Sequence, residues 1–363
     1  MNLTDLRDEL TTHADDLGTA PDFTAGVAGR VRTTKRRRAV AAGSVATLAV
    51  AALAVGVVTS LGRPAPTVPA GPPSSAAPMI GADGMPFRSV PDAPGDVVKD
   101  GLRYRARVGD DTLVAGFIGD RGQGQFSLVW EPTTTHVSIG AECYLPGLTD
   151  AEAATYMVTV SFGGTAGFFG SSCAAGRPAE RDLPAGGTVP GEPGQGWTEL
   201  TVGRTASVRI QLVDAKTRKP ASVDGAQLTG AIYAQGERTL IRDLSGTPVA
   251  ALPDVIEREG YRYRLTASIA GPVDVAGTPL ETAAPQSGPF LVTSGTVVTG
   301  SPRREPAYFQ LEGLVGEQTQ WMEGGSQTAP QPSGDGRPLQ LVVAEGSAPP
   351  HGTGFIAIYT PEP

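Results

Sequence analysis

Short segments in which apolar and polar residues alternate fill the chain from about residue 97 onward. In LRYRARV, which starts at Leu102, one side of an extended chain carries Leu, Tyr, Ala and Val, and the other carries three arginines. A period of two is typical of a strand with one buried face. YRYRL, from Tyr261, repeats this pattern. The other segments that we expect to be strands are QFSLVW from 125, ATYMVTVSF from 154, ASVRIQLVD from 206, AQLTGAIYA from 226, YFQLEGL from 308, LQLVVAE from 339 and GFIAIYT from 354.

Five short landmarks recur in the same order in this region, which indicates an internal duplication. The tryptophans of WTE and WME are expected in the core of each copy or just beneath its rim. Because Gly and Pro turns separate the strands and no amphipathic helix lies between them, we predict two tandem antiparallel β-sandwich-like modules, at 97–236 and 255–363, joined by a linker at 237–254. The landmarks are GLRYR (101), GQFSLV (124), WTE (197), QLV (211) and AIY (231) in the first copy, and GYRYR (260), GPFLV (288), WME (321), QLV (340) and AIY (357) in the second.

The longest apolar stretch, AVAAGSVATLAVAALAVGVVTSLG at 39–62, carries no charge. As a helix it would be about 36 Å long, enough for a hydrocarbon core of about 30 Å. Six cations precede it and one follows closely, so the positive-inside rule places the N-terminus in the cytoplasm and the chain after about residue 63 outside. The preceding cations are Arg30, Arg32, Lys35, Arg36, Arg37 and Arg38.

Two alternatives to this membrane anchor are a cleaved signal peptide and a buried core helix. The charged region before the apolar stretch is longer than a signal peptide has, and the stretch itself exceeds the usual 7 to 15 residues. The basic flank and the Pro-rich exit disfavour a core helix. We therefore expect residues 1–38 to be a cytoplasmic segment, 39–62 a transmembrane helix and 63–96 an extended proline-rich stalk.

The charge balance and the cysteines agree with this topology. The chain has a net charge of −8, and residues 1–38 hold seven bases and six acids, so the acidic excess lies in the outer part. An acidic outer part argues against a nucleic-acid partner. Cys143 and Cys173 both follow the anchor, in an oxidising compartment, so we expect them to form a disulfide. The copies differ in length around these cysteines, which places the disulfide in an elaboration of the first copy.

Arg103, Arg105 and Arg107 lie on one side of a predicted strand, about 7 Å apart. Such a stripe is suited to phosphates or carboxylates of an envelope polymer. The alternative is a solvated face paired with acids on a neighbouring strand, and we favour this second interpretation.

The sequence contains no pattern that indicates catalysis or a bound cofactor. HExxH, GxSxG, phosphate-loop, EF-hand and CxxC patterns are all missing, and the histidines are His13, His136 and His351. We predict no enzymatic activity, no cofactor and no metal. A secreted or anchored hydrolase whose triad is assembled from distant segments is a remote alternative.

The cytoplasmic segment has an apolar stripe at helical spacing, formed by Leu3, Leu6, Leu10 and Leu17. Acidic residues occupy the early turns, where the helix dipole favours them. The stripe is either a tail that rests on the membrane or a docking face for a cytoplasmic protein.

The arrangement of the chain resembles that of actinobacterial single-pass envelope proteins, among them membrane-bound anti-sigma factors and related sensors. The features that carry the resemblance are the acidic N-terminal helix, the run of arginines, the apolar anchor, the proline stalk and the outer β domain. The resemblance covers the arrangement of about the first 95 residues and implies control of a cytoplasmic sigma factor by an outer sensing domain. The HxxxCxxC zinc pattern of one large anti-sigma class is missing here.

Two functions remain in competition. In the first, the outer modules recognise an envelope polymer or protein, and residues 1–38 pass a signal to a cytoplasmic partner. In the second, the protein is a membrane-anchored adhesion or wall-binding module with an inert tail. The sequence names neither the ligand nor the oligomeric state.

Overall fold

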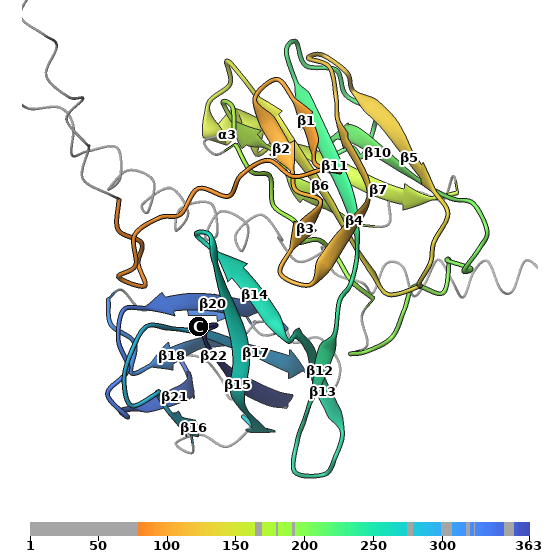
Figure 1. Ribbon diagram of the computed structural model, residues 1–363. Coiled ribbons are helices and arrows are strands. Elements are labelled where there is room, and N and C mark those ends of the chain that lie inside the picture. Colours follow the sequence, from red (N-terminus) through yellow and green to blue (C-terminus); the bar gives the residue numbers. More distant parts are fainter. Residues whose placement is uncertain are drawn as a thin grey trace, which may run out of the picture. The chain divides into compact units, whose positions relative to one another are not determined.

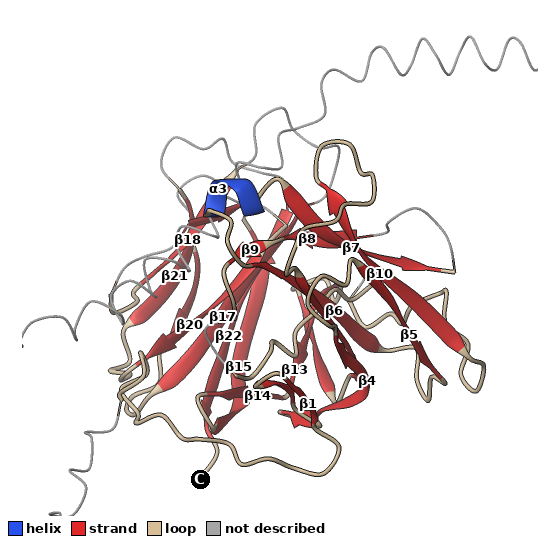
Figure 2. Cartoon of the chain, turned by 90° about the horizontal axis from the view of Figure 1, so that it is seen from above, coloured by secondary structure: helices blue, strands red, loops and turns tan. Residues whose placement is uncertain are grey.

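A computed structural model describes residues 79–163, 169–178, 181–190, 193–273, 279–298, 307–316, 320–322, 324–344 and 352–363. Strands in several sheets dominate this part of the chain, which confirms the prediction of a mainly β protein (Figures 1 and 2). No helix in it is long and apolar enough to span a membrane. The segments predicted at 1–38 and 39–62, and residues 63–78 of the predicted stalk, lie outside the described residues.

The first group of strands, orange to green in Figure 1, contains a hairpin and two larger sheets. The sheets have the orders β3-β4-β11-β6-β9 and β5-β10-β7-β8, and β1 pairs with β2. The short helix α3 (Asp150–Ala153) begins with a capping box between Thr149 and Glu152. The strands are β1 (Val97–Lys99), β2 (Leu102–Tyr104), β3 (Arg107–Val108), β4 (Asp111–Ile118), β5 (Gln125–Trp130), β6 (Val137–Leu145), β7 (Tyr156–Phe162), β8 (Phe169–Ser172), β9 (Ala174–Ala175), β10 (Ala206–Asp214) and β11 (Gln227–Ala234).

The second group, teal to blue in Figure 1, repeats this topology strand for strand. Its sheets have the orders β14-β15-β22-β17-β20 and β16-β21-β18-β19, and β12 pairs with β13. Each strand of the second group therefore corresponds to the strand whose number is eleven lower, and its neighbours in the sheet correspond in the same way. The strands are β12 (Arg238–Arg242), β13 (Pro248–Pro253), β14 (Val255–Arg258), β15 (Tyr261–Pro272), β16 (Leu280–Ala283), β17 (Phe290–Val298), β18 (Tyr308–Glu312), β19 (Gln320–Met322), β20 (Ser326–Gln331), β21 (Pro338–Val343) and β22 (Gly352–Pro361).

The register of the central strands supports the same correspondence. In AIY of β11, Tyr233 pairs with Leu113 after a register shift, and in AIY of β22, Tyr359 pairs with Leu265 beside an equivalent shift. The edge strands differ, because β9 pairs with β6 in parallel whereas β20 pairs with β17 antiparallel.

Three of the five sequence landmarks do not occupy matching positions, and these pairings were wrong. GLRYR belongs to β2, but GYRYR opens β15, the counterpart of β4. GQFSLV forms β5 whereas GPFLV enters β17, and Trp197 lies outside the strands whereas Trp321 lies in β19. QLV and AIY do correspond. GLRYR and GYRYR each follow a two-residue hairpin turn in which both residues have positive φ, Asp100-Gly101 in the first case and Glu259-Gly260 in the second. The same requirement at the turn accounts for the similarity of these two sequences.

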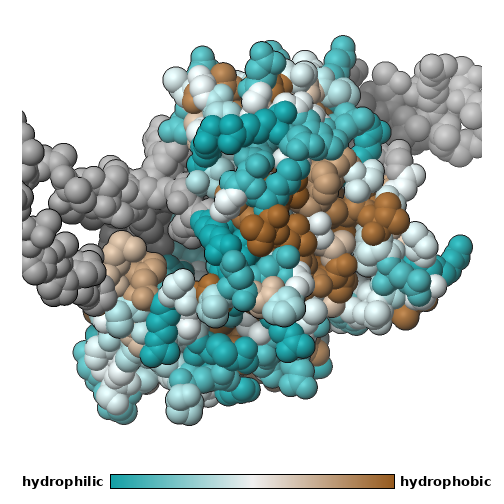
Figure 3. Space-filling model, turned by 45° about the horizontal axis from the view of Figure 1, so that its top comes forward, coloured by the Kyte–Doolittle hydropathy of each residue, from teal (hydrophilic) through white to brown (hydrophobic). Residues whose placement is uncertain are grey.

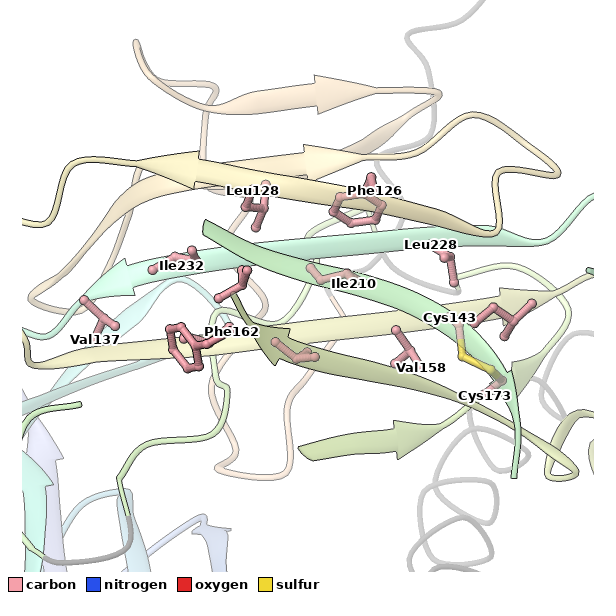
Figure 4. Packing of buried hydrophobic residues seen from close by; sticks show 14 of the residues in the cluster. Phe126, Leu128, Val137, Cys143, Val158, Phe162, Cys173, Ile210, Leu228 and Ile232 are labelled. Carbon is pink, nitrogen blue, oxygen red and sulfur yellow. A yellow bond between two sulfur atoms is a disulfide. The ribbon is translucent and has the colours of Figure 1, made fainter. Parts of the chain in front are cut away.

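In each group, side chains from both sheets form one hydrophobic cluster. In the first, Phe126 and Ile210 of the four-stranded sheet meet Val137 and Ile232 of the five-stranded sheet (Figure 4). In the second, Phe309 and Leu341 meet Phe290 and Ile358. The two sheets of each pair therefore face each other across a common core. Trp197 and Trp321 are both buried there, as predicted.

The two hairpins cover the outer faces of the five-stranded sheets. Leu102 and Tyr104 of β2 pack against Tyr233 of β11. Ile241 and Val249 of β12 and β13 are buried in a cluster that also contains Phe355 of β22. This second hairpin occupies residues that we expected to be a linker, 237–254. Because β11 and β22 are covered on both faces, their sequences are apolar or small at nearly every position.

Residues 79–96, which we name the strap, are folded against both groups and are not the free stalk that was predicted. Met85 packs in the cluster of Tyr263 and Tyr359. The backbone N–H of Arg88 donates to the carbonyl of Glu259 at 3.1 Å. The strap then reaches the first group, where the Asp96 carboxylate accepts from the N–H of Ala106 at 2.7 Å.

Ion pairs join the two groups next to the strap. Arg105 donates to both oxygens of Glu257 at 2.5 and 3.0 Å. In the opposite direction, Arg262 donates to the Asp110 carboxylate and to the carbonyl of Gly109. Arginines of GLRYR and GYRYR therefore connect the two copies to each other.

The face drawn in Figure 3 is predominantly hydrophilic, with hydrophobic side chains gathered in a limited area. Leu244, between β12 and β13, is 95% exposed. This side chain is useful as a reporter of accessibility, because it contributes nothing to either core.

The predicted disulfide is confirmed. Cys143 of β6 is bonded to Cys173, which directly precedes β9, with a Cα–Cα distance of 4.8 Å (Figure 4). Both residues are buried within the first cluster. The bond closes a loop of 30 residues and holds the start of β9 beside β6.

Replacing both cysteines by serine should lower the free energy of unfolding by about 3 to 4 kcal/mol on the chain-entropy model. Chemical denaturation of the oxidised wild type and the double variant measures this difference. Reduction of the wild type is the control, since it should produce the same loss. A variant as stable as the oxidised protein would contradict the role assigned to the bond.

Candidate functional site

A pocket of about 270 Å³ lies at one end of the first group of strands and is lined by three arginines. Four separate segments form it: the β1–β2 turn, the turn after β4, the loop after β9 and the beginning of β11. The lining residues are Asp100, Gly101, Leu102, Arg121, Arg177, Pro178, Arg181 and Gln227.

Backbone hydrogen bonds fix the segments that carry the arginines. In the turn that holds Arg121, the N–H of Gly122 donates to the carbonyl of Ala226 at 2.6 Å, beside the start of β11. The loop with Arg177 leaves β9 through Gly176, whose N–H donates to the carbonyl of Leu145 at 3.0 Å. Gly176 has a φ of +80°, a backbone conformation that favours glycine. The disulfide at Cys173 precedes this loop and thus restrains it.

Arg181 is held directly against β2. Its carbonyl accepts from the N–H of Arg103, and the N–H of Leu183 donates to the carbonyl of Arg103, both at 2.8 Å. The segment thereby extends the β1–β2 hairpin by one further pairing, and Leu183 is buried in the cluster below it. The Arg181 backbone is consequently more firmly placed than that of an ordinary surface loop.

The pocket carries an excess of unneutralised positive charge. Arg121 and Arg177 make no hydrogen bond or ion pair within the described part of the chain, and Arg181 pairs with Asp92 at 2.8 Å. Asp100 is the acidic residue of the lining. Guanidinium groups present several N–H donors in a plane and bind phosphate or carboxylate in a bidentate manner.

The amide of Gln227 is a second feature of the pocket lining. Its residue is only 6% exposed, and its Nε2 atom is buried without a hydrogen-bond partner among the described residues. A buried amide N–H without an acceptor costs about 1 to 3 kcal/mol. Because Gln227 Nε2 is closed to solvent, an oxyanion in the pocket would neutralise the arginines but would reach this donor only if the Gln227 side chain turned toward it.

Next to the pocket, the guanidinium of Arg103 is buried among carboxylates and is only 2% exposed. It donates to both oxygens of Asp182 at 2.7 Å, to Asp92 at 2.7 Å and to the carbonyl of Val90 at 3.0 Å. The Asp96 carboxylate lies 3.4 Å from Arg103 Nη1, the atom that donates to Asp92. Arg103 thus connects β2, the strap and the loop that carries Arg177 and Arg181, which we name the arginine loop.

These contacts keep the carboxylates ionised. The pKa of Asp92 is lowered, first by its hydrogen bond from Arg181 and also by Arg103. Burial alone would raise the pKa of Asp96, but the N–H groups of Ala106 and Ala93 and the charge of Arg103 outweigh burial and lower it. Since both pKa values are depressed, the stabilisation is present above the ordinary carboxyl pKa and is lost as the pH falls through the folded values.

The arginines predicted as one stripe do not share a face. Arg103 is buried, Arg105 is bound to Glu257, and Arg107 is exposed. The strand breaks after Tyr104, between β2 and β3, so the alternation that was assumed for LRYRARV does not continue. This description does not support the anion-binding ladder considered for Arg103, Arg105 and Arg107. Arg103 and Arg105 do pair with acids, as the favoured alternative held, but not on one solvated face. The candidate anion site is formed by arginines elsewhere in the chain.

The structure places few of the other predicted residues at a site. Leu3, Leu6, Leu10 and Leu17 lie outside the described residues, as do His13 and His351. His136 lies close to Thr134 and to the carbonyl of Gly194. Within the described ranges, no group of three His, Cys, Asp or Glu side chains is arranged to hold a metal ion.

The second group has a different residue at the key position. Gln227 lies six residues before Tyr233 and pairs with Tyr144 of β6, whereas Thr353 lies six residues before Tyr359 and pairs with Val297 of β17. The arginine loop of the first group also follows the disulfide, which the second group lacks. The pocket is therefore a feature of the first copy.

No family model and no curated protein matches this sequence. Among solved structures, the chain is similar to one from a structure titled "Life in the extremes: atomic structure of Sulfolobus Turreted Icosahedral Virus". The match has 12% identity and a TM-score of 0.18, and it covers 70% of this chain and 87% of the viral one. A TM-score this low supports no conclusion about fold or function.

Substitution of Arg103 by methionine should destabilise the protein by about 3 to 5 kcal/mol, because it leaves Asp96 and Asp182 without their partner. Arg107→Met is the matched control and should change stability by no more than about 0.5 kcal/mol. Denaturation at pH 7 compares the two. The Arg103 penalty should also shrink as the pH falls below about 4 and through the lowered pKa values of Asp92 and Asp96, where these carboxylates become protonated. Equal effects of the two substitutions at pH 7 would contradict the burial of Arg103.

Proposed function

We propose that residues 79–363 form a non-enzymatic recognition domain that binds an anionic group in the pocket of Arg121, Arg177 and Arg181. The observation that supports this most directly is that Arg121 and Arg177 line the pocket without a hydrogen bond or ion pair within the described residues. A phosphate or a carboxylate matches this donor set. Both groups occur in envelope polymers, which is the ligand class we infer.

We also propose that this domain stands outside a membrane as two tandem β-sandwich modules. The uncharged stretch at 39–62 and the cations before it support a single crossing with residues 1–38 in the cytoplasm. The disulfide agrees with an oxidising compartment. In this proposal the partners are the lipid bilayer, an anionic envelope component and, through Leu3, Leu6, Leu10 and Leu17, a cytoplasmic protein such as a sigma factor.

An anchored adhesion or wall-binding module with an inert cytoplasmic tail is the second candidate. The same pocket would serve this function, because binding to a wall polymer needs no signal. The two candidates differ in whether occupancy of the pocket has a consequence for the strap that leads toward residues 39–62.

Titration of the full-length protein in detergent with inorganic phosphate, followed by calorimetry, tests the pocket. Arg121→Gln and Arg177→Gln should each weaken phosphate binding about tenfold or more, since hydrogen bonds to charged groups are worth about 1.5 to 3 kcal/mol. Arg107→Gln removes an exposed charge from the same group of strands and should change the affinity less than about twofold. Glucuronate in place of phosphate distinguishes a carboxylate ligand from a phosphoryl ligand.

Equal phosphate binding by the wild type and by the Arg121→Gln, Arg177→Gln double variant would contradict the pocket assignment. The absence of binding of both phosphate and glucuronate would contradict anion recognition altogether.

The membrane topology can be tested by thiol labelling of intact cells, because the native cysteines are joined to each other and stay silent. Leu244→Cys should react with a membrane-impermeant maleimide, while Asn2→Cys should react only after permeabilisation. The side chain at 244 is fully accessible in the fold, so burial does not protect it. Labelling of Asn2→Cys but not of Leu244→Cys on intact cells would reverse the orientation.

A further inference from the structure

The pocket and the strap share one cation. The Nη2 atom of Arg181, which lines the pocket, lies 2.8 and 2.9 Å from the two oxygens of Asp92 in the strap. The Asp92 side chain is 59% exposed, so its place depends on the two guanidiniums that hold it, Arg181 and Arg103. An anion bound beside Arg181 would lie near a carboxylate of the same sign.

We propose that occupancy of the pocket loosens the strap, because the bound anion and Asp92 compete for Arg181. This inference rests on the proposed anion recognition and adds its regulation. Competition for one charged group is a negative coupling, and coupling free energies are reciprocal. An anion weakens the attachment of Asp92, and Asp92 in turn weakens binding of the anion.

The contacts along the strap show where such loosening would act. Asp92 lies close to the end that contacts the first group, and Arg88 and Asp83 lie at the end that contacts the second. The Arg88 guanidinium stands 4.1 Å from the ring centre of Tyr261, and the buried Asp83 carboxylate accepts from the hydroxyl of Tyr263. The strap is thus attached through buried groups near residue 83 and, near the pocket, through Asp92 and the carbonyl of Val90. Loss of Arg181 to an anion would leave these two groups on Arg103 alone.

Asp96 is buried whereas Asp92 is exposed, and this difference limits the loosening to one part of the strap. Its side chain is 4% exposed and accepts backbone N–H groups of Ala93 and Ala106, so it keeps partners when Arg181 is occupied. The segment expected to respond therefore runs from Arg88 to Asp92. Since the strap precedes both groups of strands and follows the predicted membrane segment, it is the route by which binding outside would act on residues 1–38.

The test combines affinity and hydrogen exchange on the full-length protein in detergent, with inorganic phosphate as the probe. Asp92→Asn removes the competing carboxylate and should raise the affinity for phosphate about fivefold or more, within the usual range of coupling between sites. Asp120→Asn is the control. It removes one negative charge beside Arg121, but that carboxylate pairs with Lys99 and touches no pocket arginine, so the gain should be smaller.

Hydrogen exchange of the wild type gives a second measurement that does not depend on a variant. At saturating phosphate, the amide of Arg88, which donates to Glu259, should exchange severalfold faster, while amides of β10 should not change. Unchanged exchange in the strap with phosphate demonstrably bound, or equal affinities of Asp92→Asn and Asp120→Asn, would overturn the coupling and leave the proposed recognition intact. If phosphate does not bind at all, the inference falls together with the proposed function.

Discussion

The buried guanidinium of Arg103 is the interaction on which the organisation of this protein depends. A charge with 2% exposure is tolerated only when its hydrogen-bond donors are matched, and here Asp182, Asp92 and the carbonyl of Val90 provide the partners. These partners come from the arginine loop and from the strap. One side chain of β2 therefore fixes both segments, and Arg181 of the loop lies beside Asp92 of the strap.

The two groups of strands share one topology but differ locally, and Arg177 and Arg181 belong to a loop that follows the disulfide of the first group. The two copies share the order and the neighbours of their strands, and each covers its five-stranded sheet with a preceding hairpin. The first copy alone has the disulfide and the loop that follows it. Arginines in this added loop are not needed by the common fold, and one of them, Arg177, has no partner within the described ranges.

The strands were largely predictable, because alternation in QFSLVW and ASVRIQLVD matches β5 and β10 to the residue. The correspondence between the two groups of strands was predictable only in part. QLV and AIY recur because central strands need the same burial on both faces, but GLRYR and GYRYR recur because two different hairpins need the same turn. Short motifs record local requirements, and the position of a strand in a sheet is set by long-range pairing.

The candidate site was missed for a related reason. Arg121, Arg177 and Gln227 are far apart in sequence, and only the pairing of β11 with β6 and the loop after β9 bring them together. The extra length around Cys143 and Cys173 was the one available signal, since it marked where the first copy had been elaborated. The arginine stripe drew attention instead, although its members serve the fold: Arg103 holds the strap and Arg105 holds the second copy.

The central claim is that an anion occupies the space between Arg121, Arg177 and Arg181. Crystals of the protein soaked in selenate and measured at the selenium edge test it directly. The account predicts an anomalous peak within hydrogen-bond distance of these guanidiniums. A peak elsewhere, or an empty pocket in crystals that bind selenate at other positions, would contradict it.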